Sequence, residues 1–218
     1  MKNKQFIVIG CGRFGSSVAK TLTRLGHEVM VIDNNSDIIK EISEFVDHAV
    51  QMDALDEASF RTIGLRNFDV AVIAIGSDIE ASIMATIIAK EAGVPTVIAK
   101  ALTEIHGKVL SKIGADKIIY PERDMGLRVA YGISSPNILD IIEFSPDYSI
   151  IETEALKDWE NKSLKDLNLS RQYGMSVIAI KTGEDINIVP SSDEIIKKDD
   201  VIVILGSNEN LRIITDNN

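Results

Sequence analysis

The sequence predicts an α/β protein in which a doubly wound parallel sheet is followed by a helical connector and a small α+β domain. Three observations lead to this prediction. Apolar runs rich in Val and Ile alternate with helical segments up to Tyr120, this rhythm stops there, and shorter strands and helices fill the remaining residues. With 45% hydrophobic residues among 218, the chain can bury a core in each part.

The first domain, residues 3–120, is expected to contain six strands. Several of the runs are apolar at every position, which is typical of parallel strands covered on both faces. The runs are FIVIG (6–10), EVMVID (28–33), HAVQM (48–52), VAVIAI (70–75), TVIAKA (96–101) and KIIYP (117–121). Helices are expected between them at 14–25, 36–45, 56–63, 79–92 and 104–113. Gly26, Gly93 and Gly114 lie at or just past helix ends, where glycine suits a left-handed cap.

A connecting helix is expected at 121–134, and a second helix after it that reaches Phe144. Ser135 and Pro136 suit the N-cap and first position of that second helix. Its apolar side chains exceed what a lone exposed helix shows, and they have two open explanations: packing on the protein's own sheet or on another subunit. These residues are Ile138, Leu139, Ile141, Ile142 and Phe144.

The final domain, residues 135–218, is expected to be a small α+β unit. The patterns predict a strand at 149–156, a short helix at 161–174 and a hairpin with its turn at 182–185. A further strand is expected at 199–207 and a closing helix at 209–217.

Composition and charge exclude several kinds of partner. The formal net charge is −10 and no basic block is present, which disfavours binding to nucleic acid or to an anionic membrane. Cys11 is the only cysteine, so no intramolecular disulfide can form, and a reducing, cytoplasmic setting fits. The longest apolar runs fall far short of the roughly 18 residues of a membrane span, and we see no secretory leader. We therefore expect the chain to act at a membrane only through a partner.

A glycine motif follows the first strand. Gly10, Gly12 and Gly15 form G-x-G-x-x-G between an apolar run and a helix, and Asp33 closes the second strand 18 residues beyond Gly15. Such glycines let the backbone approach a phosphate, the helix N-terminus supplies free N–H groups, and the acid can accept from ribose hydroxyls. The sequence therefore predicts a Rossmann-like dinucleotide site. Asp33 would repel a 2′-phosphate and Asn34 and Asn35 offer no cation, which disfavours NADP.

Other candidate residues lie where the later strands end. Asp53 follows the third strand, Gly76 and Ser77 follow the fourth, and Lys100 lies near the end of the fifth. The carboxyl ends of parallel strands form the ligand side of such a sheet. Two plainer interpretations stay open: Asp53 as the N-cap of the next helix, and Lys100 as a surface lysine with a buried stem.

The sequence lacks the acid/base pair that a dehydrogenase needs beside its nicotinamide. His27 and His48 lie at strand beginnings, which is the wrong end of the sheet, and His106 has no evident orienting partner. No His and Cys cluster suited to a metal is present. Arg13, in the first turn of the first helix, is unfavourable to the helix dipole unless an anion is bound there.

These motifs resemble the regulator-of-potassium-conductance (RCK) domain, and more closely the cytoplasmic regulatory subunits of Ktr/Trk-type potassium uptake systems. The resemblance covers essentially the whole chain, with an N-terminal RCK domain, a connector and a C-terminal RCK domain. The segments that carry it are VIGCGRFGSSVAKTL, VIDNN, LRNFDVAVIAIGSDIEASI, KVLSKIGADKIIYPERDMG and QYGMSVIAIKTG.

The resemblance implies a regulatory site for ATP, ADP or NAD(H). It implies that Arg13 reaches the terminal phosphate of ATP, in its own or the neighbouring subunit's site, and that Glu122 binds Mg²⁺ or Ca²⁺ at a dimer interface. Without the resemblance, Glu122 is only a polar turn residue. The implied lining residues are Gly10, Gly12, Arg13, Phe14, Gly15, Asp33, Asn34, Asn35, Asp53, Ala54, Ile75, Gly76, Ser77, Lys100, Ala101, Leu102, His106 and Glu122.

The resemblance also implies an assembly and a second ligand. Homodimers join into a ring of eight on the cytoplasmic face of a membrane-embedded K⁺ transporter subunit, and nucleotide-driven changes in ring shape gate K⁺ flow. Cyclic di-AMP is implied in the C-terminal domain, although Ser170 and Ser176 depart from the expected arginine and asparagine, so a dimerisation domain without a ligand stays equally open. Its candidate residues are Leu167, Asn168, Leu169, Ser176, Val177 and Pro190.

Three functions remain to be compared. The first is a non-enzymatic, nucleotide-sensing subunit of a K⁺ transporter. The second is an NAD-dependent oxidoreductase, which the missing acid/base pair and Arg13 argue against. The third is a free cytosolic nucleotide sensor, which differs from the first only in its partner.

Overall fold

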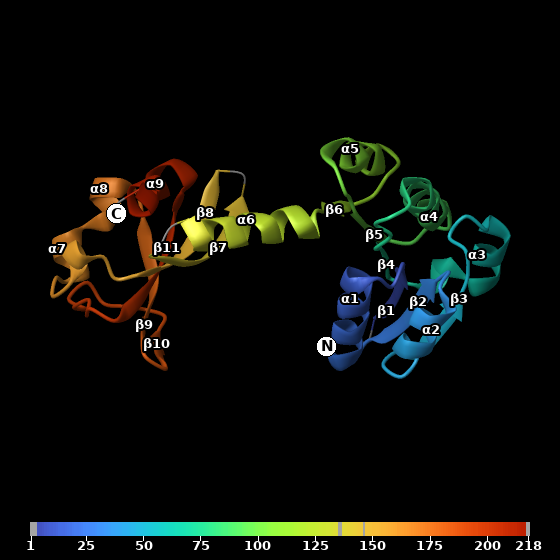
Figure 1. The fold of residues 1–218 in the computed structure, drawn as a ribbon, viewed down its shortest axis with the longest axis horizontal. Helices are drawn as coiled ribbons and strands as arrows, with labels where there is room; N and C mark the ends of the chain where they lie inside the picture. Colours follow the sequence, from blue (N-terminus) through green and yellow to red (C-terminus); the bar gives the residue numbers. More distant parts are fainter. Residues whose placement is uncertain (1–3, 135–136, 146, 217–218) are drawn as a thin grey trace. The chain divides into compact units, whose positions relative to one another are not determined.

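A computed structural model of the chain describes residues 4–134, 137–145 and 147–216. The chain divides into two compact units, Met1–Glu122 and Arg123–Asn218, and each has its own sheet and core (Figure 1). Among the described residues, no helix is both long enough and apolar enough to span a membrane.

The first unit contains a parallel sheet of six strands in the order β3-β2-β1-β4-β5-β6. This order reverses direction between β1 and β4, as in doubly wound sheets. The predicted Rossmann-like fold is therefore confirmed. The strands are β1 (Gln5–Ile9), β2 (Glu28–Asp33), β3 (His48–Gln51), β4 (Val70–Ile73), β5 (Thr96–Lys100) and β6 (Lys117–Ile119). The helices between them are α1 (Arg13–Arg24), α2 (Ser36–Ile42), α3 (Glu57–Ile63), the short η1 (Leu65–Asn67), α4 (Ile79–Glu91) and α5 (Glu104–Lys112).

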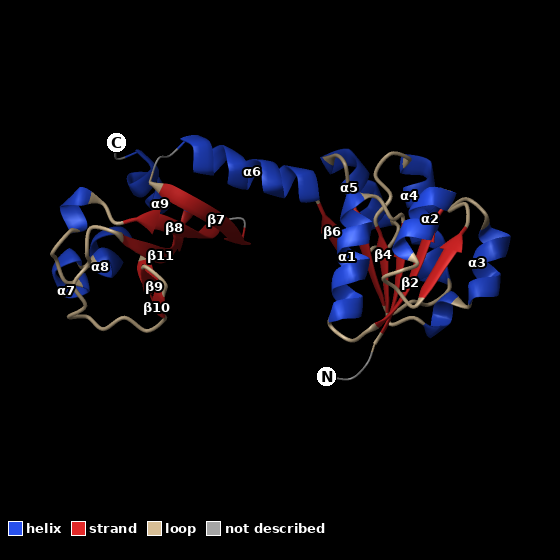
Figure 2. Cartoon of the chain, turned by 60° about the horizontal axis from the view of Figure 1, so that its bottom comes forward, coloured by secondary structure: helices blue, strands red, loops and turns tan. Residues whose placement is uncertain are grey.

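Side-chain alternation along the strands divides this unit into two core layers. Ile7 and Ile9 of β1 pack in the layer that α3, α4 and α5 cover, while Val8 packs in the layer under α1 and α2. Helices therefore lie on both faces of the sheet (Figures 1 and 2). The predicted glycine caps are confirmed, since Gly26, Gly93 and Gly114 all have positive φ.

The second unit contains an antiparallel sheet in the order β10-β9-β11-β8-β7. Its strands are β7 (Ile138–Ser145), β8 (Tyr148–Glu154), β9 (Ser176–Thr182), β10 (Asp185–Asn187) and β11 (Asp200–Ser207). The helices are α6 (Pro121–Ser134), η2 (Lys157–Trp159), α7 (Leu164–Leu167), α8 (Leu169–Tyr173) and α9 (Asn208–Asp216). Trp159, the only tryptophan of the chain, is buried in this unit's core with Met175 and Ile202. The hairpin of β9 and β10 turns through Gly183, as predicted.

Residues 138–144 form a strand, so the prediction of a second helix there is wrong. β7 pairs antiparallel with β8, and its isoleucines are β-branched residues that favour strands. Ile138 is buried and Ile141 packs against the core, which supports packing on the protein's own sheet for these two. Leu139, Ile142 and Phe144 stay exposed in the single chain. The predicted N-cap and first position, Ser135 and Pro136, lie outside the described residues.

The predicted helix at 161–174 is divided in two. Asn168 adopts a left-handed conformation, with φ of 44° and ψ of 39°, and separates α7 from α8. Asparagine tolerates this region better than most residues. Leu167 and Leu169, on either side of it, both enter the core of the second unit.

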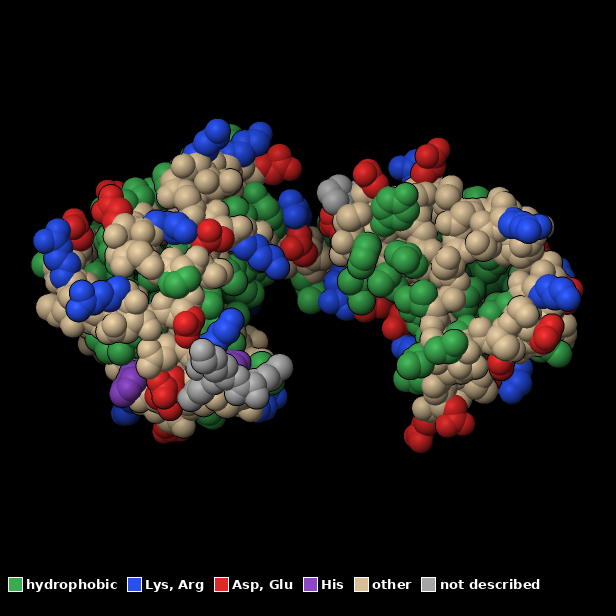
Figure 3. All heavy atoms as spheres, turned by 180° about the vertical axis from the view of Figure 1, so that it is seen from behind, with side chains coloured by type: hydrophobic (Ala, Val, Ile, Leu, Met, Phe, Trp, Pro, Cys, Tyr) green, Lys and Arg blue, Asp and Glu red, His purple; other side chains and the backbone are tan. Residues whose placement is uncertain are grey.

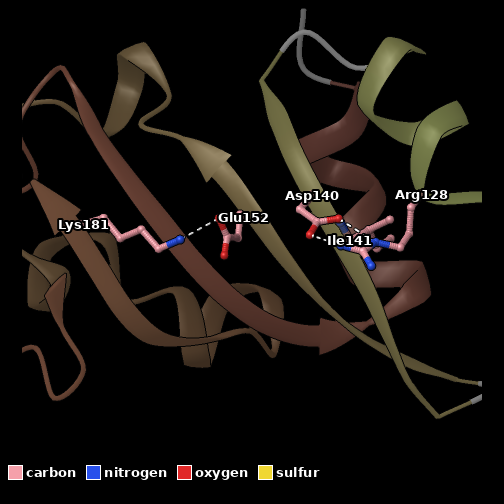
Figure 4. Close-up of polar contacts among 5 residues, drawn as sticks. All are labelled: Arg128, Asp140, Ile141, Glu152 and Lys181. Atoms are coloured by element: carbon pink, nitrogen blue, oxygen red, sulfur yellow. Dashed lines mark hydrogen bonds and ion pairs between the residues drawn. The ribbon is translucent and has the colours of Figure 1, made fainter. Parts of the chain in front are cut away.

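Two ion pairs lie on the sheet of the second unit (Figure 4). Arg128 of α6 donates to both carboxylate oxygens of Asp140 in β7, and Lys181 of β9 donates to Glu152 of β8 at 2.8 Å. The Arg128 hydrogen bonds are the main cause of the lowered pKa of Asp140. The forked pair joins α6 to β7 through two directional bonds. The described side chains of α6 are all at least partly exposed.

Asp200 provides a test of the second unit's packing. It is 2% exposed and accepts from the Thr182 hydroxyl at 2.6 Å and from the Lys197 N–H at 2.8 Å. We expect Asp200→Ala to lower the free energy of unfolding by about 2 kcal/mol, because buried donors lose their acceptor. Urea denaturation measures this. Asp199→Ala, at the exposed neighbour, should change it by less than about 0.5 kcal/mol, and equal losses would contradict the account.

Candidate nucleotide-binding site

The glycine motif forms a tight turn that excludes larger side chains at two of its positions. Gly10 has φ of +89°, and a Cβ there would lie 2.9 Å from the backbone nitrogen of Ile75. A Cβ at Gly15 would lie 2.0 Å from the carbonyl oxygen of Gly10. By contrast, a Cβ at Gly12 would meet no atom within 4 Å. The turn is thus closed against β4 and open above Gly12, on the side where a phosphate would approach the backbone.

The N-terminus of α1 has no side-chain cap. Gly12 occupies its N-cap position, and no acidic residue lies in its first turn. The next four α-helices of this unit begin differently, because Asn35, Asp56, Asp78 and Thr103 accept backbone hydrogen bonds at their starts. The free N–H groups of α1 and its positive dipole end therefore suit an anionic group.

Asp33 connects the end of β2 to the glycine turn. Its Oδ2 accepts from the Cys11 N–H at 2.6 Å, and its Oδ1 accepts from the Asn35 N–H at 2.9 Å. Each carboxylate oxygen can accept more than one hydrogen bond, so ribose hydroxyls can still be bound. Asn35 itself caps α2, and the side chain of Asn34 is exposed beside it.

The ends of β3 and β4 contribute the next candidates. Asp53 is exposed and accepts from the Leu55 N–H at 2.9 Å. The N-cap of α3 is Asp56, so the interpretation of Asp53 as that cap is wrong. Ala54 is buried below it. After β4, Ile75 lies against Gly10, and Ser77 is exposed.

Lys100, at the end of β5, is buried and paired with Glu122. It is only 7% exposed, and its Nζ lies 2.5 Å from Glu122 Oε1. Its Nζ also lies 6.0 Å from the centre of the Phe14 ring. The interpretation of Lys100 as a surface lysine is therefore wrong. The Lys100 hydrogen bond is the main cause that lowers the pKa of Glu122, and the charge of Arg13 contributes in the same direction.

His106, in the first turn of α5, is buried and neutral. Its Nδ1 accepts from the Leu102 N–H at 3.4 Å, so Nε2 carries the proton of the neutral ring. Burial lowers the pKa of His106. Its Nε2 has no hydrogen-bond partner in the part of the chain that the structure describes. A buried donor of this kind fits a ligand with acceptor oxygens. In the same loop Ala101 is buried and Leu102 is exposed.

The structure thus brings the candidates of the first unit to one edge of its sheet. Gly10, Asp33, Gly76, Lys100 and Glu122 follow or end β1, β2, β4, β5 and β6, and all these strands run in the same direction. Arg13 is exposed at the first position of α1. Lys100 and Glu122 were both predicted at this edge, but their pairing was not predicted. The neighbouring positions of β5 and β6 bring the two residues to one edge but do not determine that their side chains pair.

Other features bear on chemistry at this edge. His27 precedes β2 and His48 begins β3, so both lie at the opposite end of the sheet, as predicted. Among the described residues, no three His, Cys, Asp or Glu side chains form a metal-binding group. A cation at Glu122 would therefore need further oxygen ligands, and phosphate oxygens and water are the ones that Mg²⁺ usually takes.

The candidate residues for a cyclic di-AMP site in the second unit differ in how exposed they are. Leu167 and Leu169 belong to its core, and Val177 packs against that core. Asn168 lies in the break between α7 and α8, Ser176 is exposed at the start of β9, and Pro190 is half-buried beyond β10. The exposed and half-buried positions are the ones able to contact a ligand.

The fold of this chain is the one found in structures of RCK domains. The RCK domain of GsuK has the same fold, with a TM-score of 0.69 at 15% identity, over 99% of this chain and 47% of that one. Residues 6–121 match the TrkA-N domain model and residues 150–216 match the TrkA-C domain model.

Two relatives with higher sequence identity show the family of the chain. The chain is 42% identical to the Ktr system potassium uptake protein A of Bacillus subtilis, covering 97% of this chain and 96% of that protein. It is 44% identical to protein C of the same system in Bacillus subtilis, covering 94% of this chain and 92% of that protein. The chain belongs to this family of TrkA-N and TrkA-C domain proteins.

Cys11 in the glycine turn allows a chemical test of the site. Burial, and secondly the charge of Asp33, raise the pKa of its thiol to about 11. Since the folded state favours the neutral thiol, Cys11 should label slowly with iodoacetamide below about pH 9 and rapidly once the chain is unfolded. Because the pKa of Cys11 is raised in the folded state, the free energy of unfolding should fall as the pH rises from about 9 towards 11. In Cys11→Ala this fall should be smaller. Equal labelling rates in native and unfolded protein would contradict this.

Proposed function

We propose that this chain is the nucleotide-sensing regulatory subunit of a Ktr-type potassium uptake system. It binds ATP and ADP, and also NAD(H), at the glycine turn, and performs no chemistry on them. Homodimers assemble into an eight-membered ring on the cytoplasmic face of a membrane-embedded K⁺ transporter subunit. The names and near-complete coverage of its relatives support the K⁺ uptake part of this proposal.

The observation that carries the nucleotide-binding part is the uncapped N-terminus of α1 over an open glycine turn. Free N–H groups, the helix dipole, the ammonium of Lys100 and the buried Nε2–H of His106 all lie on the ligand side of the sheet. These groups stabilise a phosphate chain, while Asp33 accepts from the ribose. When bound, a divalent cation neutralises charge between the phosphates and Glu122.

Arg13 distinguishes ATP from ADP in this proposal. It is the first residue of α1 and is exposed, so its guanidinium can extend past the turn to a terminal phosphate. A cation at this end of a helix is unfavourable by itself, and an anion removes that cost. ATP gates K⁺ flow because it binds one ring shape more tightly than the other, which shifts the ring towards the shape that it favours.

The alternative function, an NAD-dependent oxidoreductase, requires a proton donor or acceptor beside the nicotinamide. At this edge the histidine is His106, whose Nδ1 accepts from the Leu102 N–H and whose Nε2–H has no partner among the described residues, so this residue does not separate the two functions. The uncapped α1 and Asp33 suit NAD equally well, so ligand binding alone does not separate the two functions. The role of Arg13 does, because NAD has no terminal phosphate for it to contact.

Titration of purified protein with ATP, ADP and NADH in the presence of Mg²⁺ tests this proposal. We expect ATP to bind more tightly than ADP, and Arg13→Ala to weaken ATP roughly tenfold while changing ADP little, because a charge-assisted contact to one phosphate is lost. Arg24→Ala, at the other end of α1, is the control and should change neither affinity. Binding of NADH alone, with no effect of Arg13→Ala, would contradict the proposal.

A further inference from the structure

A glycine inside α5 leaves room for the side chain of Tyr120. Gly107 is buried in this helix, where glycine is less favourable than alanine. A Cβ at Gly107 would lie 1.9 Å from the Tyr120 hydroxyl oxygen and 2.8 Å from the ring carbon that carries it. The hydroxyl therefore occupies the space that a methyl group would need, and Tyr120 packs directly on the backbone of α5. A larger residue at this position would have to move either the ring or the helix.

This contact lies next to the buried imidazole of His106. The residue is 3% exposed, and its Nε2–H has no hydrogen-bond partner among the described residues. Its Nδ1 accepts from the Leu102 N–H at 3.4 Å, which is long for a hydrogen bond. One long bond orients the ring only weakly. The place of the imidazole therefore depends on where the backbone of α5 lies.

The ends of β5 and β6 close a set of contacts around this imidazole. The Ala101 N–H donates to the Ile119 carbonyl oxygen at 2.9 Å, which joins the loop after β5 to the end of β6. The next residue of that loop, Leu102, donates to His106, and the residue after Ile119, Tyr120, packs on the glycine of α5. The first turn of α5 is thus held by the loop on one side and by the tyrosine on the other.

We propose that Tyr120 is a positioning residue of the nucleotide site: its hydroxyl, packed on Gly107, fixes α5 so that His106 Nε2–H faces the phosphate oxygens of the ligand. This inference rests on the proposed function, since it concerns the same site. A buried donor without a protein acceptor is unfavourable unless a ligand supplies the acceptor. Tyr120 acts on that donor through the backbone of α5. Its effect on binding therefore depends on the presence of the imidazole.

Gly107→Ala tests this inference without removing a polar group. The added methyl displaces either the Tyr120 hydroxyl or α5, so we expect the affinity for ATP, titrated with Mg²⁺ present, to fall roughly tenfold. In a His106→Leu background the same change should have little further effect, because the donor through which it acts is gone. No loss of affinity in Gly107→Ala, or an equal loss in both backgrounds, would overturn the inference.

A second substitution should rescue this variant. Tyr120→Phe combined with Gly107→Ala should regain most of the ATP affinity, because the methyl takes the place that the hydroxyl has left. Gly126→Ala in α6, where a Cβ would meet no atom within 4 Å, is the matched control and should bind ATP as the wild type does. A double variant that binds no more tightly than Gly107→Ala would contradict the proposed role of the hydroxyl.

The pKa of His106 gives a measurement that needs no nucleotide. Burial lowers this pKa, so a displaced α5 that lets water reach the ring should raise it towards its usual range. NMR titration of the imidazole Cε1–H should show the rise in Gly107→Ala and its reversal in the double variant, with His106→Leu identifying the signal. An unchanged pKa in Gly107→Ala would overturn the inference. If the wild type binds no ATP, the proposed function fails, whereas the pKa comparison still decides whether Tyr120 positions His106.

Discussion

The contact between Gly15 and the carbonyl of Gly10 is the constraint on which the site depends. It brings the first turn of α1 against the end of β1 at a distance that no Cβ permits. The helix therefore begins immediately after the turn, and its unpaired N–H groups face the carboxyl edge of the sheet. Asp33 holds the same turn from the other side through the Cys11 N–H. Any side chain added at Gly15 would push α1 outward and move these N–H groups, Arg13 and Phe14 together.

The charges at this edge follow from that geometry. Positive potential comes from the uncapped helix end, Arg13 and the buried Lys100. Glu122 forms an ion pair with Lys100. This group of positive charges is unfavourable in an isolated chain, because buried charges without enough opposite charge lower the stability of the fold. It becomes favourable when an anion with several charges is bound. The site thus gives up some stability in the free protein for affinity towards a polyphosphate.

Much of the fold could be predicted because local pattern and final structure agree in the first unit. Continuous Val and Ile runs, glycine caps and the G-x-G-x-x-G turn each determine short-range structure. The strand β7 could not be predicted, because the spacing of Ile138, Ile141 and Ile142 fits either a helix or a strand. Pairing with β8 is what makes this segment a strand. At the site, the positions at strand ends were predictable from topology. The Lys100–Glu122 pair was not, since side-chain burial and partner choice depend on the packing of Phe14 and Gly76 around the ammonium.

The strand β7 of the second unit carries exposed apolar side chains. The side chains of Leu139, Ile142 and Phe144 on β7 are all about half exposed or more, and Figure 3 shows hydrophobic side chains gathered on that unit. The forked Arg128–Asp140 pair fixes α6 next to this strand without covering these side chains. Exposed apolar side chains of this size are stabilised when another surface covers them.

The position of Trp159 gives the chain an internal optical reporter. It is the only tryptophan, and it lies in the core of the second unit, whereas the glycine turn, Asp33 and Lys100 belong to the first. Tryptophan emission therefore senses only the unit that holds none of these nucleotide-site residues. A change in that emission when a nucleotide binds to the first unit would be a direct sign that binding in one unit alters the interior of the other. The chain thus carries its own probe of communication between its two halves.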